Sequence, residues 1–125
     1  MAELKKNDYK NMYLPRELTA FINKVYDTGF FKDRYYICKY GFAYAIKYHF
    51  EEFDPLEIDQ NSPSDGFNWD VNSIDDDNFL KNFVLSAYPD CDLPYRYVRG
   101  IVIFGLKKLS DKLGSAKDII LSDLM

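Results

Sequence analysis

Apolar residues recur with helical spacing in the first part of the chain. The run from Pro15 to Gly29 contains four of them at relative positions i, i+3, i+4 and i+7, namely Leu18, Phe21, Ile22 and Val25. This spacing places them on one face of an α-helix. Proline is favoured in the first helical turn, and glycine just after the last one. The pattern therefore predicts an amphipathic helix between Pro15 and Gly29.

The next apolar segment predicts a longer and more buried helix, from about residue 34 to residue 52. Asp33 is a suitable N-cap for it. The polar residues of this helix fall near one narrow stripe, and aromatic and aliphatic residues cover most of its remaining circumference. A helix of this kind packs on several sides. Gly41, near its middle, costs about 1 kcal/mol relative to alanine, so we expect another helix to approach closely there.

Tyrosines occupy more than one face of this second predicted helix. They are Tyr35, Tyr36, Tyr40, Tyr44 and Tyr48. We expect most of these rings to lie in the core and some to reach the surface. Exposed tyrosine is enriched at protein interfaces, so the pattern adds support to a binding role.

Two apolar runs in the second half of the chain predict further helices, over residues 79–87 and 94–113. The first follows three consecutive aspartates, which suit the positive end of a helix. It precedes Pro89, which a helix interior does not tolerate. A last short helix is predicted over residues 115–124. We therefore predict a mainly α fold, a compact bundle of four to five helices in which those at 34–52 and 94–113 form the central pair.

Residues 54–77 show no helical pattern and are rich in Pro, Gly, Ser and Asn. We predict a long acidic loop there, of a length that is typical of functional or mobile segments. Apolar and polar residues alternate over residues 67–74, which leaves a short β-hairpin as an alternative. The polar residues 1–13 are predicted to be a flexible N-terminus. The chain as a whole, residues 1–125, is predicted to be a single domain.

Half of the acidic residues occupy one window that contains no Lys or Arg. Residues 51–77 hold ten of the 20 Asp and Glu residues, and the rest of the chain holds all 16 Lys and Arg residues. Such a distribution indicates a binding partner or a strong internal field, because charge governs association more than it governs fold. The residues that we expect to contact a protein partner are Trp69, Asp70, Asp75, Asp76 and Asp77.

Two other interpretations of the acidic window stay open. One is a flexible loop that keeps the protein in solution. The other is a mimic of a phosphate backbone, whose carboxylates would occupy the nucleic-acid-binding cleft of another protein after long-range electrostatic attraction.

Basic residues of the predicted helix at 94–113 form a second candidate surface, for nucleic acid. They are Arg96, Arg99, Lys107 and Lys108. Nucleic-acid binding requires a basic face, whereas this chain has a formal net charge of -4. We therefore expect any direct contact with nucleic acid to be secondary to contact with a protein.

The sequence contains no motif that indicates catalysis. His49 is the only histidine, and Glu52 follows it by three residues, so the pair offers two metal ligands. Neither Glu-x-x-His nor His-Glu-x-x-His is present. The chain also lacks a Gly-x-Ser-x-Gly motif and a phosphate-binding loop. We therefore predict a protein that is not an enzyme, with no catalytic residue, no metal site and no cofactor, in which His49 is half-buried.

Composition and cysteine usage predict a folded protein of the cytoplasm. Hydrophobic residues make up 47% and aromatic residues 18% of the chain, which suffices for a core without disulfides. The two cysteines, Cys38 and Cys91, occur without a secretory signal, as is typical of a reducing compartment. No run approaches the roughly 18 apolar residues of a membrane span, so we expect no membrane partner.

Three segments of the chain carry a resemblance to a known family. They are Gly29–Asp33 with the apolar helix that follows, residues 67–85, and Tyr97–Phe104 with the later Leu109 and Gly114. Together they resemble the family known as Dnd system-associated protein 4, whose members are encoded beside bacterial DNA phosphorothioation and phage-defence genes. The resemblance covers most of the chain from Gly29 onward and includes no catalytic signature.

The resemblance implies a small accessory subunit that works with a larger ATPase or nuclease of an antiviral defence complex. With the uneven charge and the missing catalytic motifs, it leads us to predict a non-enzymatic subunit of an anti-phage defence or DNA-processing complex, which binds a larger protein through its acidic segment. The alternative is an acidic inhibitor or immunity protein that blocks the basic, nucleic-acid-binding cleft of a target.

Overall fold

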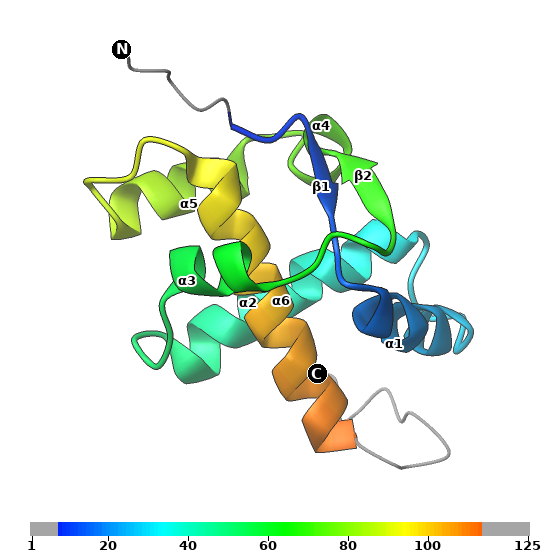
Figure 1. Cartoon of the computed structure of the whole chain (residues 1–125). Coiled ribbons are helices and arrows are strands. Elements are labelled where there is room, and N and C mark those ends of the chain that lie inside the picture. The colour runs from blue at the N-terminus through cyan, green and yellow to red at the C-terminus, as the bar shows by residue number, and fades with distance from the viewer. Residues whose placement is uncertain (1–7, 114–125) are drawn as a thin grey trace.

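The computed structural model describes residues 8–113, and it is mainly helical (Figure 1). In chain order its elements are β1 (Asn11–Tyr13), α1 (Arg16–Tyr26), α2 (Arg34–His49), α3 (Pro55–Asn61), β2 (Asn68–Asp70), α4 (Val71–Ile74), α5 (Phe79–Ala87) and α6 (Pro94–Leu113). The mainly α fold class predicted from the sequence is confirmed. The predicted helix over residues 115–124 lies outside the described residues.

Helices α2 and α6 cross at the centre of the fold, as predicted (Figure 1). Their backbones meet where Gly41 faces Gly105, because a Cβ atom at Gly105 would overlap the backbone carbonyl of Gly41. A Cβ atom at Gly41 would in turn lie 2.8 Å from Leu106 Cδ2, which is closer than a normal contact. Glycine at both positions therefore allows the two helices to approach closely, as expected from the place of Gly41 in the sequence.

Helix α6 is the centre of the apolar core. Its apolar residues with an exposed fraction of 1% or less are Val98, Ile101, Val102, Ile103, Leu106 and Leu109. Helix α3 packs against α6 at Gly100, where a Cβ atom would overlap the carbonyl of Pro55. Helix α5 also contacts α6. The core is thus organised around α6, with α2, α3 and α5 packed against it.

The acidic segment at residues 54–77 is not the loop predicted from the sequence, because it contains α3, β2 and α4. Helix α2 ends at His49, and Pro55 is the first residue of α3. Proline suits that position, since the first N–H group of a helix has no partner within the helix. Asp54 caps α3 by accepting hydrogen bonds from the backbone N–H groups of Leu56 at 3.0 Å and Glu57 at 3.4 Å.

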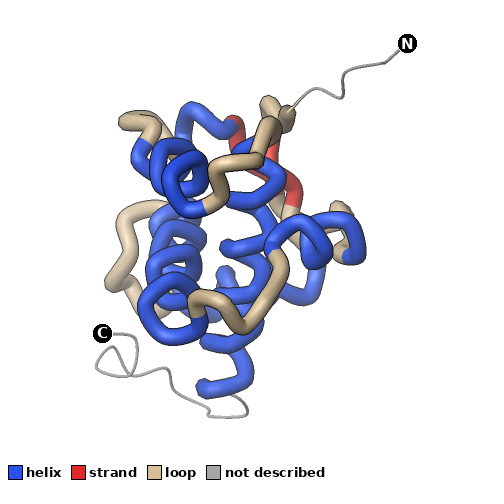
Figure 2. The backbone as a smooth tube through the Cα atoms, turned by 90° about the vertical axis from the view of Figure 1, so that its left-hand side faces the viewer, coloured by secondary structure: helices blue, strands red, loops and turns tan. Residues whose placement is uncertain are grey.

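The two strands form a small antiparallel sheet that joins distant parts of the chain. Met12 of β1 pairs with Trp69 of β2. The residues next to the two strands are also hydrogen-bonded: the N–H of Leu14, which follows β1, donates to the carbonyl of Phe67, which precedes β2, at 2.8 Å. The alternative predicted for residues 67–74 was a short β-hairpin. The structure has a short antiparallel pair, in which β2 pairs with the distant β1 and not with a neighbouring strand. Figures 1 and 2 place this sheet away from the C-terminal end of α6.

Residues 8–13 belong to the folded body, which corrects the prediction of a flexible N-terminus over residues 1–13. Met12 is fully buried. The carboxylate of Asp8 accepts a hydrogen bond from the backbone N–H of Tyr95 at 2.9 Å, at the start of α6. The beginning of the described chain is therefore fixed to its last helix.

Candidate functional site

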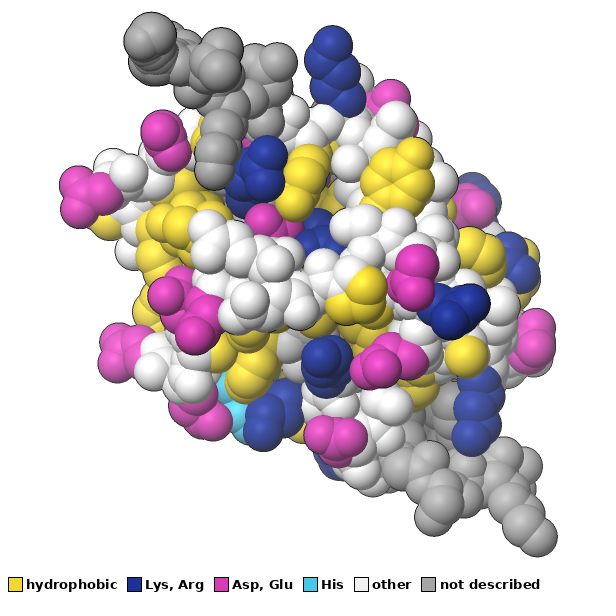
Figure 3. Space-filling model, in the orientation of Figure 1, with side chains coloured by type: hydrophobic (Ala, Val, Ile, Leu, Met, Phe, Trp, Pro, Cys, Tyr) yellow, Lys and Arg dark blue, Asp and Glu magenta, His cyan; other side chains and the backbone are white. Residues whose placement is uncertain are grey.

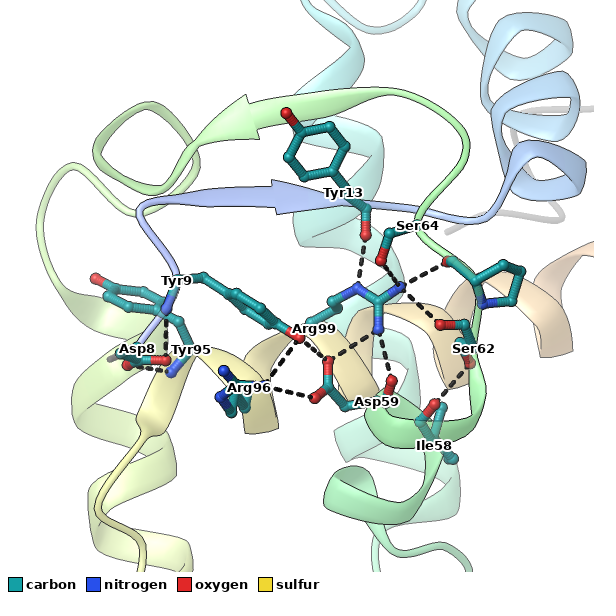
Figure 4. A network of polar contacts seen from close by, with 11 residues as sticks. Asp8, Tyr9, Tyr13, Ile58, Asp59, Ser62, Ser64, Tyr95, Arg96 and Arg99 are labelled. Atoms are coloured by element: carbon teal, nitrogen blue, oxygen red, sulfur yellow. Dashed lines mark hydrogen bonds and ion pairs between the residues drawn. The ribbon is translucent and has the colours of Figure 1, made fainter. Parts of the chain in front are cut away.

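A buried ion pair between α6 and α3 is the centre of a network of polar contacts (Figure 4). Arg99 Nη1 lies 2.9 Å from Asp59 Oδ1, and each side chain is 1% exposed. Arg99 Nε donates to the carbonyl oxygen of Tyr13 at 2.6 Å. Its Nη2 donates to the carbonyl oxygen of Pro63 at 2.7 Å and to Ser64 Oγ at 3.1 Å. Every nitrogen of the guanidinium therefore has an acceptor, and the network connects β1, α3 and α6.

Tyr9 and Arg96 complete this network. The Tyr9 hydroxyl donates to Asp59 Oδ1 at 2.8 Å. The Arg96 guanidinium lies over the Tyr9 ring, 4.6 Å from its centroid, and Nη1 lies 3.8 Å from Asp59 Oδ2. Burial raises the pKa of the Tyr9 phenol, and the hydrogen bond to Asp59 raises it further. Buried charges that are paired and hydrogen-bonded in this way are typical of a structural contact.

Asp75 is the second buried acidic residue, and it holds the start of α5. One carboxylate oxygen accepts a hydrogen bond from the N–H of Leu80 at 2.9 Å, and the other from the N–H of Lys81 at 3.0 Å. The Tyr95 hydroxyl of α6 also donates to Asp75, at 3.0 Å. Burial, followed by this hydrogen bond, raises the pKa of the Tyr95 phenol. Because Asp75 is only 1% exposed, a partner cannot reach it in this structure.

Other aspartates of the acidic window act as caps too. Asp65 accepts a hydrogen bond from the N–H of Arg16 at 2.7 Å, at the start of α1. Asp70 accepts one from the N–H of Asn72 at 2.7 Å, and Asp77 one from the N–H of Phe79 at 3.0 Å. Aspartate is among the preferred capping residues, and its charge suits the positive end of a helix. Much of the acidic enrichment in this window therefore serves local folding.

The predicted partner contacts differ in accessibility. Asp70, Asp76 and Asp77 are exposed, and Trp69 is half-buried. Trp69 makes an edge contact with the Phe67 ring, with 5.8 Å between the centroids. The Asp76 side chain is 76% exposed, so a partner can reach it, and its Oδ1 lies 3.9 Å from Nζ of Lys39 in α2.

The predicted basic surface is not continuous. Arg99 is buried in the ion pair described above, and Arg96 is held against Tyr9. Lys107 is exposed and Lys108 is half-buried, but Lys107 comes eleven positions after Arg96 along α6, which corresponds to about 16 Å. On the face shown in Figure 3, acidic and basic side chains intermingle over the surface. The structure thus does not bring these four basic residues together.

An apolar groove between α2 and α5, which the sequence did not predict, lies near Asp76. Its volume is about 300 Å³, and its lining residues are Lys39, Phe42, Ala43, Ile46, Lys47, Phe79, Leu80 and Phe83. The walls are almost entirely apolar, so the two lysines line it with their aliphatic stems. Phe79 is 62% exposed. The edge contact between Phe42 and Phe83, at 5.7 Å, joins the two helices.

A second hollow adjoins this groove along α2. Its volume is about 180 Å³, and its lining residues are Tyr40, Ala43, Tyr44, Lys47 and Tyr48. Tyr48 is 52% exposed, and the Lys47 ammonium lies 5.1 Å from its ring centroid. Because Ala43 and Lys47 belong to both hollows, the two form one surface. We call the residues that line them the aromatic face.

The two side chains considered as metal ligands in the sequence, those of His49 and Glu52, are close in space. His49 Nδ1 lies 3.1 Å from Glu52 Oε1. Within residues 8–113, no three His, Cys, Asp or Glu side chains are positioned to hold a metal ion together. Cys38 is buried, and burial raises the pKa of its thiol well above its usual value. Among the helices that the structure describes, none is long and apolar enough to cross a membrane.

Comparisons of this chain with models of protein families, with curated proteins and with solved structures found no significant match.

Proposed function

We propose that this protein is a non-catalytic interaction subunit that binds a larger protein through the aromatic face of α2 and α5. The observation that carries the proposal is the exposure of Phe79 and Tyr48 on the edges of two adjoining hollows. Contiguous exposed apolar surface is typical of protein-binding sites. Aromatic residues are enriched in such sites relative to the rest of a protein surface.

The acidic residues expected at the interface support the same location. Asp76 lies beside Lys39, which lines the groove. Asp77 caps the first turn of α5 through the N–H of Phe79, which also lines the groove. The proposed surface therefore unites two of the predicted acidic contacts with the aromatic face. A charged rim around an apolar centre is the usual composition of a protein interface.

The resemblance to the Dnd system-associated protein 4 family suggests where such a partner belongs. We propose that it is a larger subunit of a bacterial anti-phage defence or DNA-processing complex, such as an ATPase or a nuclease. This part of the proposal rests on the three sequence segments alone.

An exposed alanine in the shared wall of the two hollows gives the decisive test. Ala43→Glu places a carboxylate on the aromatic face. Glutamate is a good helix former and would stand four residues from both Lys39 and Lys47, so α2 should stay folded. The matched control is Ala20→Glu, at an exposed position of α1.

The measurement is recovery of the native partner with the tagged protein from its source cells. We expect the partner to be lost with Ala43→Glu and retained with Ala20→Glu, while thermal unfolding of both variants matches that of the unaltered protein. Equal recovery of the partner with the two variants would contradict the proposed function.

A further inference from the structure

We infer that the groove between α2 and α5 binds an amphipathic helix of the partner, one that carries acidic residues beside its apolar stripe. This inference rests on the proposed interaction function and names the chemistry of the segment that binds.

The dimensions of the groove suit a helix. Its α2 wall runs from Lys39 to Lys47, which at the rise of an α-helix is about 12 Å, or roughly two turns. Phe79, Leu80 and Phe83 form the opposite wall. Recognition of a helix in a groove uses apolar anchors at i, i+3, i+4 and i+7, and these anchors also span two turns.

The chemistry of the walls argues against an extended segment. A strand or a polyproline segment presents backbone N–H and C=O groups that need partners. The groove walls offer almost no polar surface, and both walls are helices, whose backbone groups are already paired. Burying an unpaired backbone group is costly. A helix satisfies its own backbone hydrogen bonds, so it can enter this groove without that cost.

The charges beside the groove specify acidic flanks on the bound helix. Lys39 and Lys47 are the two titratable residues that line it. The Lys39 ammonium has an acidic neighbour, since its Nζ lies 3.9 Å from Asp76 Oδ1. Lys47 is exposed, and its ammonium lies over the Tyr48 ring. Acidic residues two turns apart on the partner would face both lysines, because that spacing is again about 12 Å.

The two ends of the groove differ, which sets a direction. Asp76, just before α5, lies at the Lys39 end. Phe50, which follows α2 beyond Lys47, makes ring contacts with Phe83 and Tyr88, with centroid distances of 6.4 Å and 6.2 Å. Helices α2 and α5 therefore run in the same general direction. The N-terminus of a helix is its positive end and the C-terminus its negative end, so we place the N-terminus of the bound helix beside Asp76 and its C-terminus towards Lys47.

Two synthetic peptides test this inference with the full chain. Each has about 18 residues, so that the helix can form, and a leucine stripe at i, i+3, i+4 and i+7. One carries glutamate beside the stripe and the other carries lysine at the same positions. We expect the acidic peptide to bind about tenfold more tightly than the basic one, as two favourable exposed ion pairs would give. Backbone amide shifts of the labelled protein should change at the groove residues.

A charge exchange provides the matched control. Lys47→Glu should reduce or reverse the preference between the two peptides. Lys32→Glu, at an exposed position that does not line the groove, should preserve it. Equal binding of both peptides, shifts outside the groove, or no binding of the acidic peptide at about 1 mM would overturn the inference.

The Ala43→Glu experiment separates failure of this inference from failure of the proposed function. If the native partner is lost with Ala43→Glu but the acidic peptide does not bind, the protein still uses the aromatic face and the inferred helix is wrong. If the native partner is retained with Ala43→Glu, the proposed function itself fails.

Discussion

Arg99 is a charged residue within an apolar core, and its surroundings explain how it is tolerated there. It lies on α6 among fully buried aliphatic side chains and is paired with Asp59. The sequence does not reveal this position, since arginine and aspartate are almost never fully buried unless they are paired. Only the approach of α3 and β1 to α6 supplies the acceptors. For this reason Arg99 was predicted as a surface contact.

Replacing Arg99 by methionine should destabilise the protein by about 3–5 kcal/mol, because Asp59 would remain buried without its charged partner. The control, Lys107→Met, changes an exposed side chain on the same helix, and it should alter stability by no more than about 0.5 kcal/mol. Urea denaturation measures the free energy of unfolding of both variants. Similar unfolding midpoints for the two variants would show that the ion pair does not hold the fold together.

The Tyr95 hydroxyl links stability to alkaline pH. Its pKa is raised in the folded protein, by burial and by the hydrogen bond to Asp75. The contribution of this hydroxyl to the free energy of unfolding is therefore fully present below about pH 10, where a tyrosine of the unfolded chain is still protonated. Above that pH the unfolded chain loses this proton while the folded protein keeps it, so stability should fall as pH rises towards the folded pKa.

The measurement is the free energy of unfolding at several pH values above 9. Tyr95→Phe should lower stability at neutral pH by about 1 kcal/mol and should make the alkaline decline less steep. Tyr48→Phe removes a hydroxyl from a largely exposed ring and serves as the control. An unchanged alkaline slope in Tyr95→Phe would mean that other groups cause the decline.

The longer helices could be predicted from the sequence, because the periodic spacing of apolar residues becomes recognisable once a helix has several turns. Helices α1, α2, α5 and α6 have nine to 20 residues, and their apolar spacing shows in the sequence. Helix α3 has seven residues and α4 has four, too few for a period to emerge. The pairing of β1 with β2 joins segments more than fifty residues apart, which local patterns do not encode.

The close contact between α2 and α6 depends on Gly105, and a substitution that adds a single methyl group there tests this dependence. In an open helix Gly→Ala stabilises by about 1 kcal/mol. At Gly105 the added Cβ would overlap the carbonyl of Gly41, so Gly105→Ala should instead destabilise by about 1–3 kcal/mol. Ser86→Ala, at an exposed position of α5, is the control. The midpoints of thermal unfolding of the two variants are compared. A Gly105→Ala variant that is more stable than the unaltered protein would show that α2 and α6 can move apart without cost.

The candidate site was predictable only in part, because a sequence pattern shows which side chains are apolar but not which of them remain uncovered. The tyrosines of α2 indicated that some rings reach the surface, and Tyr36 and Tyr48 do so at 38% and 52% exposure. The groove itself depends on how far α5 lies from α2. That separation is set by the caps at Asp75 and Asp77 and by the packing of both helices on α6.

The behaviour of the complex in salt distinguishes the proposed subunit from an acidic inhibitor. The inhibitor alternative gains support from the folding of the acidic window, since α3, β2 and α4 fix exposed carboxylates in place. Binding by such a mimic should weaken roughly a thousandfold from about 0.05 to 0.2 M salt, as protein–DNA complexes do. Docking through the aromatic face should weaken by no more than about tenfold, because only a few exposed ion pairs are screened.

The measurement is a titration of the purified native partner at the two salt concentrations. A steep loss of affinity would favour the inhibitor over the subunit. The Ala43→Glu variant then reports whether the aromatic face takes part in either case.

The central place of α6 has a consequence for how the protein is made. A ribosome synthesises α1, α2, α3 and α5 before it reaches the helix on which they pack. We therefore expect the nascent polypeptide to stay open until α6 has left the exit tunnel, and then to close in one cooperative step. Chains released after residue 93 should be digested rapidly by a protease, whereas those released after residue 113 should resist. Protease resistance in the shorter chains would show that a partial core forms first.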